Sequence, residues 1–491
     1  MHFPVLIVVN DPKDWPLKFE GAELIAARTY LTDSRYAEMQ RVKVFNLCRS
    51  YKYQSIGYYV SLLAAARGHK PIPDITTVQD LKSQAIIRIA SEELDELIQK
   101  SLATIQSREF ILSIYFGHNI AKRHERLSQL LFKFFQVPFL RAYFVHSEKT
   151  NKWYLKNFSP IDVIDIPGEH QDFVIQVAKE FFERKKRLSR PQMKYRYDLA
   201  ILYNHTDSTP PSNPIAIQRF IKAAESLGIA TELIQKEDYG RIAEFDALFI
   251  RETTNVNHHT YRFARRAAAE GLIVVDDPES ILKCTNKVFL AELLLKYKIP
   301  VPKTIIVHRN NIKSLQQLLG FPCILKKPDS SFSQGVIKAD NEDELRAYIE
   351  EMLDRSEMVI AQEFMMTPFD WRVGIFNREP LYVCKYFMAE KHWQIVKRDS
   401  FGIKTEGDFE TLAVEDAPKE LIHLALRSAN LIGDGLYGVD IKQVGRKFYV
   451  IEVNDNPNID AEIEDAVLKD ELYRNIMKIF LKKIEQKKIK K

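Results

Sequence analysis

Apolar and polar residues follow one another along this chain with two periods, one typical of strands and one typical of helices. In the first part of the chain this pattern continues up to a break at Ser189, Arg190 and Pro191, where a linker is expected. The pattern predicts strands at 5–9 and 42–47, and helices at 57–67, ending before Gly68, and at 173–188. We therefore expect a first domain of α+β structure over residues 1–190.

The stretch from 195 to 285 alternates regularly between apolar strands and amphipathic helices. The predicted strands are 199–203, 231–234, 247–250 and 272–275, and the predicted helices are 215–227 and 261–270. Ser212 or Asn213 is expected to cap the first of these helices, because short polar side chains accept hydrogen bonds from its free N–H groups. Alternation of this kind is typical of a small α/β domain with parallel strands, which we place at 195–285.

Beyond residue 286 the two periods alternate less regularly. Helices are predicted at 287–297, 342–354 and 419–431, with strands between them and a helical C-terminus. Near the end, two apolar strands flank a short basic turn at Gly445, Arg446 and Lys447, and this pattern predicts a hairpin. The third domain is placed at 286–491.

Composition agrees with a chain of several globular domains. The chain has 491 residues, of which 46% are apolar and 28% charged, and at roughly 150 residues per domain this length corresponds to about three domains. No apolar run reaches the ~20 residues that a bilayer requires. The apolar N-terminus lacks the basic segment of a signal peptide, so a buried strand is expected there. The four cysteines lie far apart, which argues against a zinc site or a disulfide scaffold and favours the cytoplasm.

The small net positive charge is weak evidence about which partners the protein binds. The chain carries a net charge of +5, and six of its last ten residues are lysine. A solvated helix end explains this tail more simply than a contact to nucleic acid. We therefore expect neither nucleic acid nor a membrane as a partner.

Three polar side chains on the predicted hairpin indicate a metal site. Asp440 lies on its first strand, and Glu452 and Asn454 are two positions apart on the second strand, so they share one face. Two carboxylates and an amide oxygen suit Mg²⁺, although an exposed face with ordinary acids is an alternative. Asn456 and Asn458 follow directly and are candidate substrate contacts, because sites often lie where a buried strand ends.

Two lysines are candidates for binding phosphate. Lys326 ends an apolar strand and precedes a loop of small residues that includes Ser331, Ser333 and Gly335. Small residues let backbone N–H groups approach phosphate oxygens, and the lysine adds a point charge. Lys287, which opens a predicted helix, is the second candidate. Taken alone, either lysine is compatible with an ordinary surface position.

Further candidates lie between the phosphate lysines and the hairpin. Gln362, Glu363 and Phe364 extend an apolar strand into a connector whose backbone can meet an adenine edge. Arg372 lies near the start of the next strand and has the forked side chain that binds a carboxylate or an acyl phosphate bidentately. Lys385 lies on the strand that is expected to pair with it.

The order of these motifs resembles the ATP-grasp superfamily, and within it the RimK-type carboxylate–amine ligases, over about residues 195–485. The resemblance implies a small parallel α/β pre-grasp domain followed by a two-lobed ATP-grasp fold. By this resemblance, Lys287 and Lys326 contact phosphates, and Gln362, Glu363 and Phe364 contact adenine. Arg372 and Lys385 contact the γ-phosphate or the activated acyl group. Magnesium, with manganese as an alternative, is coordinated by Asp440, Glu452 and Asn454.

The resemblance also implies an activity. An enzyme of this kind phosphorylates a substrate carboxylate with ATP, and an amine then displaces the phosphate to form an amide bond on an amino acid, a peptide or a protein. Two other interpretations stay open, namely a non-catalytic ATP-binding regulator or scaffold and a phosphotransferase of the same fold. The expected partners are ATP, a carboxylate and an amine, and the sequence is compatible with a homo-oligomer.

The segment after the strand at 42–47 is dense in polar and aromatic residues and resembles the N-terminal domain associated with RimK-like ATP-grasp modules. The likeness then extends over nearly the whole chain. Cys48 is a candidate nucleophile or thiol sensor, but a small buried residue at a strand end is the favoured interpretation, because free cysteines are usually buried and inert. Arg49 is a candidate contact to an acidic or peptide substrate.

Overall fold

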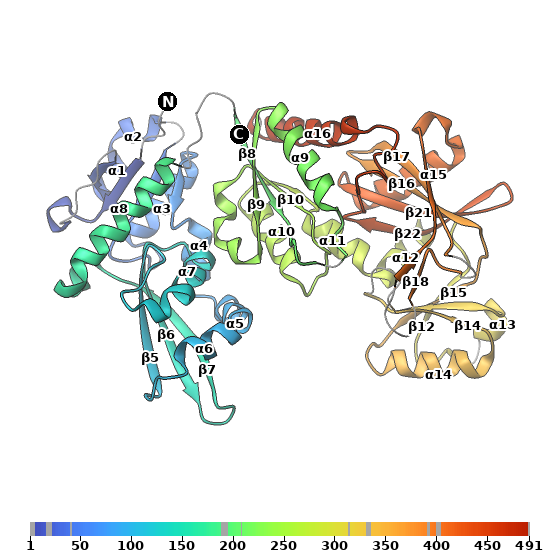
Figure 1. Ribbon diagram of the computed structural model, residues 1–491, viewed down its shortest axis with the longest axis horizontal. Coiled ribbons are helices and arrows are strands. Elements are labelled where there is room, and N and C mark those ends of the chain that lie inside the picture. Colours follow the sequence, from blue (N-terminus) through green and yellow to red (C-terminus); the bar gives the residue numbers. More distant parts are fainter. Residues whose placement is uncertain are drawn as a thin grey trace. The chain divides into compact units, whose positions relative to one another are not determined.

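The computed structural model describes residues 5–15, 22–39, 42–187, 195–207, 209–312, 315–329, 335–389, 393–398 and 404–489. The chain forms two compact units (Figure 1). Unit 1 comprises Met1–Tyr195 together with Gln235–Glu244, and unit 2 comprises Arg196–Ile234 together with Phe245–Lys491. Within the described ranges, no helix is both long enough and apolar enough to cross a membrane.

Unit 1 begins with a four-stranded parallel sheet in the order β2-β1-β3-β4. Its elements are β1 (Val5–Val9), β2 (Glu23–Ala26), α1 (Ala27–Thr32), α2 (Ser34–Glu38), β3 (Lys43–Asn46), α3 (Ile56–Ala66) and β4 (Lys70–Ile72). The helix α3 is followed by Gly68, whose φ of +70° is the left-handed conformation that suits glycine at a helix end. The strands predicted at 5–9 and 42–47 and the helix predicted at 57–67 are confirmed.

The rest of unit 1 is built around a three-stranded antiparallel sheet in the order β5-β6-β7, which was not predicted from the sequence. Its strands are β5 (Glu109–Tyr115), β6 (Phe139–Ser147) and β7 (Lys152–Pro160), and the helices of this part are α4 (Ile75–Asp80), α5 (Gln84–Glu93), α6 (Asp95–Leu102), α7 (Glu125–Phe134) and α8 (Gln171–Arg187). Fully buried side chains such as Leu112, Phe135 and Phe144 form its core. With both sheets, unit 1 has the expected mixed α and β character.

Unit 2 begins with a four-stranded sheet in the order β11-β10-β8-β9, and all of its strand pairs are parallel. Its elements are β8 (Tyr197–Leu202), α9 (Pro214–Ser226), β9 (Ile229–Ile234), β10 (Ala247–Ile250), α10 (His259–Ala269), β11 (Ile273–Val275) and α11 (Pro278–Thr285). The side chain of Asn213 caps α9 by accepting a hydrogen bond from the Ala216 N–H at 2.9 Å. The parallel α/β architecture predicted for this stretch is confirmed.

Two antiparallel sheets complete unit 2. The first has the order β12-β15-β13-β14, with β12 (Thr304–Val307), β13 (Cys323–Lys326), β14 (Val336–Ala339) and β15 (Val359–Glu363), and it is accompanied by α12 (Lys287–Lys296), α13 (Leu315–Leu319) and α14 (Glu342–Leu353). The second has the order β20-β17-β16-β21-β22, with β16 (Phe369–Phe376), β17 (Glu379–Phe387), β20 (Phe409–Leu412), α15 (Lys419–Ile432), β21 (Leu436–Val444) and β22 (Lys447–Asp455). A two-stranded ribbon, β18 (Val396–Arg398) and β19 (Lys404–Glu406), lies between β17 and β20 in the chain. The predicted closing hairpin is confirmed as β21 and β22.

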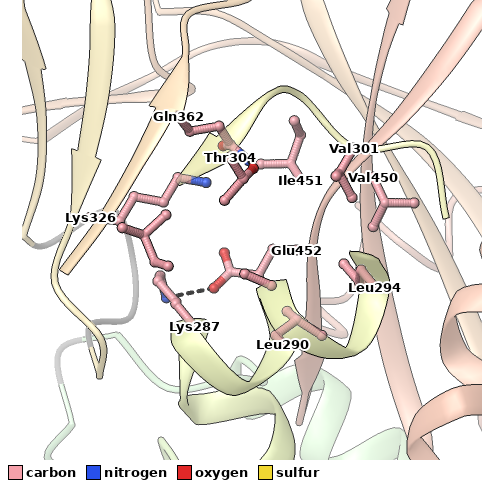
Figure 2. A pocket seen from close by; sticks show the side chains of 12 residues that line it. Lys287, Leu290, Leu294, Val301, Thr304, Lys326, Gln362, Val450, Ile451 and Glu452 are labelled. Carbon is pink, nitrogen blue, oxygen red and sulfur yellow. Dashed lines mark hydrogen bonds and ion pairs between the residues drawn. The ribbon is translucent and has the colours of Figure 1, made fainter. Parts of the chain in front are cut away.

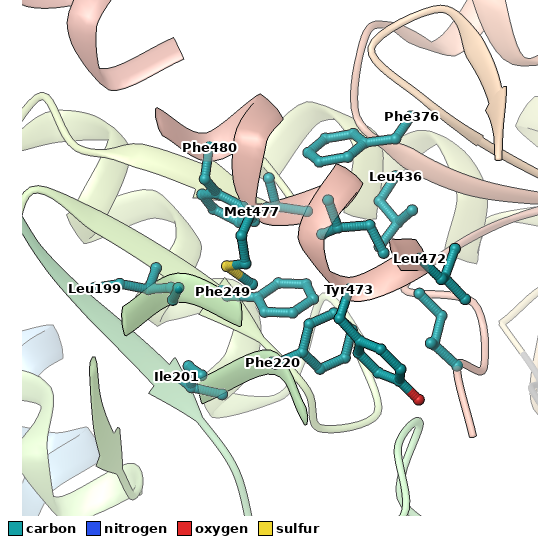
Figure 3. Packing of buried hydrophobic residues seen from close by; sticks show 14 of the residues in the cluster. Leu199, Ile201, Phe220, Phe249, Phe376, Leu436, Leu472, Tyr473, Met477 and Phe480 are labelled. Carbon is teal, nitrogen blue, oxygen red and sulfur yellow. The ribbon is translucent and has the colours of Figure 1, made fainter. Parts of the chain in front are cut away.

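The C-terminal helix α16 (Asp470–Ile489) joins the parallel sheet to the five-stranded sheet through one buried core. Figure 3 shows Phe249 of the parallel sheet beside Met477 and Phe480 of α16, with Phe376 and Leu436 of the five-stranded sheet packed nearby. The stretches 195–285 and 286–491 therefore share hydrophobic packing within unit 2.

Candidate active site

A narrow pocket in unit 2 contains several of the side chains predicted to bind nucleotide (Figure 2). Its apolar part is lined by Leu290, Leu294, Val301 and Val450, and its charged part by Lys287, Lys326 and Glu452. An apolar wall beside two lysines suits a ligand with a flat base and an anionic chain. The free space in this narrow part is about 30 Å³.

The first residue of α12 places a lysine in this pocket. Asn286 caps the helix, and the Lys287 N–H donates to the carbonyl of Pro328 at 2.7 Å. The Lys287 Nζ donates to Glu452 Oε1 at 2.6 Å, with 9% of the lysine side chain exposed. Burial acts to raise the pKa of Glu452, but the charges of Lys287 and Lys326 outweigh it and hold that pKa below its ordinary value. Glu452 is therefore an ionised carboxylate at neutral pH.

The second lysine, Lys326, ends a strand in the interior of its sheet. The strand β13 pairs with β14 on one side and β15 on the other, which leaves Lys326 only 8% exposed. Burial lowers the pKa of Lys326 to about 8, with Lys287 and Lys442 acting in the same direction and Glu452 opposing them. Within the described part of the chain, the Lys326 ammonium has no hydrogen-bond or ion-pair partner. It is thus a buried cation that an incoming anion can neutralise.

The three residues predicted to bind metal lie on one face of neighbouring strands. Asp440 of β21 is directly opposite Glu452 of β22, and Asn454 follows Glu452 by two positions. Arg372 of β16 is opposite Asp440 on the other side and binds it bidentately, with Nε–Oδ1 and Nη2–Oδ2 distances of 2.7 and 2.8 Å. The Asn454 Nδ2 donates to Asp440 Oδ2 at 3.1 Å. The structure therefore brings this predicted set together with Arg372.

A second, partly buried ion pair on the same face was missed from the sequence. The Lys442 Nζ donates to Asp370 Oδ1 at 2.6 Å and to the hydroxyl of Thr367 at 2.8 Å. Burial raises the pKa of Asp370 despite this lysine. The guanidinium of Arg372 also lies over the ring of Tyr386, 5.1 Å from its centre. The alternation of Asp370 with Arg372 along β16, and of Asp440 with Lys442 along β21, is the sequence signal that would have identified these residues.

The predicted adenine connector continues from β15 at the edge of the pocket. The buried Gln362 side chain donates to the hydroxyl of Thr304 at 2.9 Å and lines the pocket. The Glu363 N–H donates to the carbonyl of Lys303 at 2.9 Å, which aligns the connector with the start of β12. The ring of Phe364 lies 5.5 Å from the Lys338 Nζ.

The predicted phosphate loop is described only at its end. Gly335 has a φ of +76°, and its carbonyl accepts a hydrogen bond from the Lys327 N–H at 2.9 Å. Ser331 and Ser333 lie outside the described residues.

Lys385, a predicted site residue, lies on the opposite face of the five-stranded sheet from Arg372. It lies opposite Trp371, and the neighbouring Cys384 lies opposite Arg372. Because successive side chains of a strand point to opposite faces, Lys385 and Arg372 are on different faces of the sheet. The Lys385 Nζ pairs with Glu410 Oε2 at 2.7 Å and lies 5.2 Å from the Trp371 ring centre. The structure therefore does not bring Lys385 together with Arg372.

The candidate substrate residues after β22 are held in place by a buried arginine. The Arg251 Nη1 donates to Asn456 Oδ1 at 2.6 Å, and the Asn456 Nδ2 donates to the carbonyl of Glu252 at 2.5 Å. Arg251 is fully buried, which lowers its pKa to about 10. The hydroxyl of Tyr382 donates to the carbonyl of Asn458 at 3.1 Å. No role was assigned to Arg251 from the sequence.

Cys48 and Arg49 lie in unit 1, directly after β3. Cys48 is 2% exposed, and burial raises its pKa to about 12. A thiol with this pKa is protonated at neutral pH and is a poor nucleophile, in keeping with the packed role favoured from the sequence. Arg49 forms an ion pair with Asp162 at 3.4 Å.

Two models of protein families match parts of this chain. Residues 27–177 match the model of the RimK-like ATP-grasp N-terminal domain, and residues 284–379 match that of the RimK-like ATP-grasp domain. The second match contains Lys287, Lys326, the connector at 362–364 and Arg372. The matches therefore cover parts of both units.

Several curated proteins are similar to this chain. The alpha-aminoadipate–LysW ligase LysX of Saccharolobus solfataricus is 30% identical over 219 residues, which are 43% of this chain and 75% of that protein. A probable alpha-L-glutamate ligase of Vibrio vulnificus is 24% identical over 238 residues, 47% of this chain and 74% of that protein. Among solved structures, D-alanine–D-alanine ligase from Bacillus anthracis complexed with ATP covers 60% of this chain and 100% of its own at 16% identity, with a TM-score of 0.48 that is too low to carry an argument.

The site and these relatives together define an ATP-dependent ligase that joins a carboxylate to an amine with formation of a C–N bond. The chain belongs to the RimK-like ATP-grasp family. The resemblance stated from the sequence, the multidomain α/β and α+β fold and the ligase class are thereby confirmed.

Proposed function

We propose that this pocket binds ATP together with Mg²⁺ and that the enzyme joins a substrate carboxylate to the amine of an acidic α-amino acid. One observation carries the proposal: cations suited to phosphate line the same pocket as a carboxylate that belongs to the candidate metal set. Lys287 and Lys326 are the cations, and Glu452, opposite Asp440 on the neighbouring strand, is the carboxylate. The apolar wall at Leu290 and the residues near it would take the adenine base.

The donor set fits magnesium. Asp440, Glu452 and Asn454 offer two carboxylates and an amide, and Mg²⁺ takes its remaining ligands from water and substrate phosphates. Across the described residues, no group of three His, Cys, Asp or Glu side chains is arranged to hold a metal ion, and the proposed donor set consists of two carboxylates and one amide. When bound, the ion would neutralise charge on the transferred phosphoryl group.

The ion pairs of the site support joint binding of metal and nucleotide. Asp440 is held by Arg372, and Glu452 by Lys287. Asp440 and Glu452 would hold the metal when it is bound, and Arg372 and Lys287 would then pair with phosphate oxygens. Each charge thus exchanges one partner for another, which avoids leaving a buried charge unpaired.

The reaction has two steps. An oxygen of the substrate carboxylate attacks the γ-phosphorus of ATP, the bond from that phosphorus to the bridging oxygen breaks, and ADP leaves. The amine nitrogen attacks the acyl carbon of the resulting acyl phosphate, phosphate departs with the electron pair of the C–O bond, and the nitrogen loses a proton. Lys287 and Lys326 offset charge on the phosphates. Arg372 stabilises the negative charge that develops on the acyl oxygen.

The choice of the amine substrate rests on the names of the related enzymes. LysX is named for α-aminoadipate and the Vibrio vulnificus protein for L-glutamate, and a Methanocaldococcus jannaschii relative, 24% identical over 225 residues, is a coenzyme gamma-F420-2:alpha-L-glutamate ligase. All three names contain an α-amino acid with a second carboxylate. We therefore favour glutamate or a homologue of it as the amine for this enzyme.

Nucleotide binding provides the first test. The double variant Asp440→Ala with Glu452→Ala is expected to lose magnesium-dependent binding of a non-hydrolysable ATP analogue in isothermal titration calorimetry. Glu350→Ala with Glu351→Ala is the matched control, since it removes two exposed carboxylates of unit 2 outside the pocket. Magnesium-dependent binding that survives in the first variant as it does in the control would show that the metal assignment is wrong.

Product analysis provides the second test. ADP and phosphate are expected only when a carboxylate substrate and an acidic amino acid are both present, with a condensation product lighter than its two components by one water. A stable phosphorylated product would instead favour a phosphotransferase. ATP binding without turnover of any offered acid and amine would favour a regulator or scaffold.

A further inference from the structure

A second cavity in unit 2, which we call the basic groove, lies between the exposed face of α15 and the turn of the β21–β22 hairpin (elements labelled in Figure 1). Its volume is about 530 Å³, within the range of ligand sites. Lys419, His423 and Arg427 line it from the helix, and Arg446 and Lys447 line it from the hairpin turn. It shares no lining residue with the nucleotide pocket.

The groove concentrates charge that the protein does not neutralise. Among the described residues, Lys419, Arg427, Arg446 and Lys447 form no ion pair and no side-chain hydrogen bond, and Glu420 is the acidic residue of the lining. On other helices of unit 2, some exposed cations are paired along their own helix. Arg346 pairs with Glu342 at 3.1 Å on α14, and Lys478 pairs with Glu471 at 2.7 Å on α16. The groove is therefore complementary to an anionic partner.

The spacing of the charges indicates what shape this partner has. Lys419, His423 and Arg427 are four residues apart, and four helical residues rise by about 6 Å. Lys419 and Arg427 are thus separated along the helix by about 12 Å, a span that a single phosphate or carboxylate group does not cover. An extended peptide advances about 6.8 Å every two residues and places alternate side chains on one face. Acidic residues at alternate positions of such a peptide match the steps of the helix.

The walls between the charges are apolar. Leu424 of α15 and the rings of Phe448 and Tyr449 line the groove, and Pro300 closes it beside them. An apolar floor between cationic rims suits a peptide whose acidic side chains alternate with apolar ones, since the two sets of side chains point to opposite sides of an extended chain. A single-stranded nucleic acid would also bring phosphates to the rims and could stack bases on the two rings, so binding of an oligonucleotide has to be compared with binding of the peptide.

We infer that the basic groove binds an acidic, extended peptide segment of a partner protein. The inference goes beyond the proposed ligase reaction and does not depend on it, because binding here uses neither the nucleotide pocket nor the metal set. The groove is nevertheless connected to that pocket. The Val450 N–H donates to the carbonyl of Pro300 at 2.8 Å, and Val450 and Val301 line the pocket while Tyr449 and Pro300, their neighbours in the chain, line the groove.

Fluorescence anisotropy with the full-length protein and a labelled octapeptide of alternating glutamate and leucine provides the test. Binding is expected at low ionic strength, weaker at high salt, and at least ten-fold weaker in the double variant Arg427→Glu with Arg446→Glu. Arg355→Glu is the matched control, because Arg355 is an exposed arginine of unit 2 outside the groove; it is expected to bind the peptide like the unmodified protein. Binding of the ATP analogue should be retained in both variants, which shows that they are folded.

Three outcomes would overturn the inference. The first is no detectable binding of the peptide at millimolar concentration. The second is an equal loss of binding in the Arg355→Glu control, which would mark a non-specific charge effect. The third is binding of a labelled oligouridylate, abolished in the groove variant, under conditions where the acidic peptide does not bind, because the groove would then be a nucleic-acid site.

Discussion

At the scale of single residues, Lys326 is the group whose environment is most informative about binding. It is buried at the end of β13, and the charges that face it come from Lys287, Lys442, Glu452 and Asp370. Two of these neighbours are cations that already pair with the two acids, Lys287 with Glu452 and Lys442 with Asp370. The cationic form of Lys326 is therefore poorly compensated in the free protein, and phosphate oxygens would supply the missing negative charge.

This environment predicts proton uptake when nucleotide binds. With a pKa of about 8 in the free protein, Lys326 is largely neutral at pH 9, whereas phosphate beside it raises the pKa and keeps it protonated. The affinity for the ATP analogue should fall as pH rises from 8 to 10, by up to about ten-fold per pH unit. Calorimetry at pH 9 in two buffers of different ionisation enthalpy measures the uptake directly.

Two variants separate Lys326 from other lysines in this prediction. Lys326→Met should bind the analogue more weakly and without proton uptake at pH 9. Lys222→Met, which removes an exposed lysine of α9, should behave like the unmodified protein. Uptake that persists in Lys326→Met would assign the proton to a different group and contradict the role given to Lys326.

At the scale of elements, periodicity allowed some parts of the fold to be predicted and not others. The parallel strands β8, β10 and β11 were predictable because they are short apolar runs followed or preceded by amphipathic helices. The hairpin was predictable from two apolar strands around a turn at Gly445. The sheet β5-β6-β7 was not, because α7 separates β5 from β6 in the sequence and β7 carries six exposed or half-exposed positions beside its three buried ones. Local pattern says little about which distant strands pair.

In the candidate site, too, the positions of some residues could be predicted from the sequence and those of others could not. Asp440, Glu452 and Asn454 could be placed on one face because a hairpin fixes the pairing of its own strands. Lys385 could not be placed correctly relative to Arg372, because its face depends on the register between β16 and β17, and a shift of one residue moves every side chain to the other face. Partners that come from distant segments, as for Arg251, leave no local signal at all.

The hydrogen bonds of Arg251 predict that this residue stabilises the loop before α9 and the loop after β22. Its guanidinium donates to Ser212 Oγ at 2.9 Å, to the carbonyl of Pro457 at 2.9 Å and to Asn456 Oδ1, and so connects the loop before α9 with the loop after β22. Arg251→Met leaves these buried acceptors without a donor, which should lower the free energy of unfolding of unit 2 by about 3 kcal/mol. The exposed Arg355→Met should change it by less than about 0.5 kcal/mol.

Urea unfolding measures this difference. Trp371 and Trp393 report on unit 2 when Trp15 and Trp153 of unit 1 are replaced by phenylalanine. Equal stability of Arg251→Met and Arg355→Met in that background would mean that the buried network does not stabilise the loop after β22. The candidate substrate residues Asn456 and Asn458 would then need another explanation for their fixed position.

At the scale of the whole molecule, the chain passes from one unit to the other after Tyr195, Ile234 and Glu244. The short segment Gln235–Glu244 belongs to unit 1, although it lies between two strands of unit 2 in sequence. Asp238 in this segment pairs with Lys133 of α7 at 3.2 Å. Gly240 lies so close to α7 that a Cβ there would be 2.2 Å from the Lys133 carbonyl oxygen, so only glycine fits. The segment was not distinguished from its surroundings in the sequence, because it carries no composition or period of its own.

Separate cores in the two units lead to a prediction about thermal unfolding. The apolar clusters of unit 1 and unit 2 contain different residues, so two transitions are expected in differential scanning calorimetry. A ligand stabilises only the unit that binds it, by about 2.7 kcal/mol at a hundred times its dissociation constant. The magnesium complex of the ATP analogue should therefore raise one transition temperature by roughly 5 °C or more and leave the other in place.

Asp440→Ala with Glu452→Ala identifies the shifted transition as that of unit 2, because this variant should lose the shift. A single transition, or an equal shift of both, would show that the units unfold together and that nucleotide binding stabilises the whole chain.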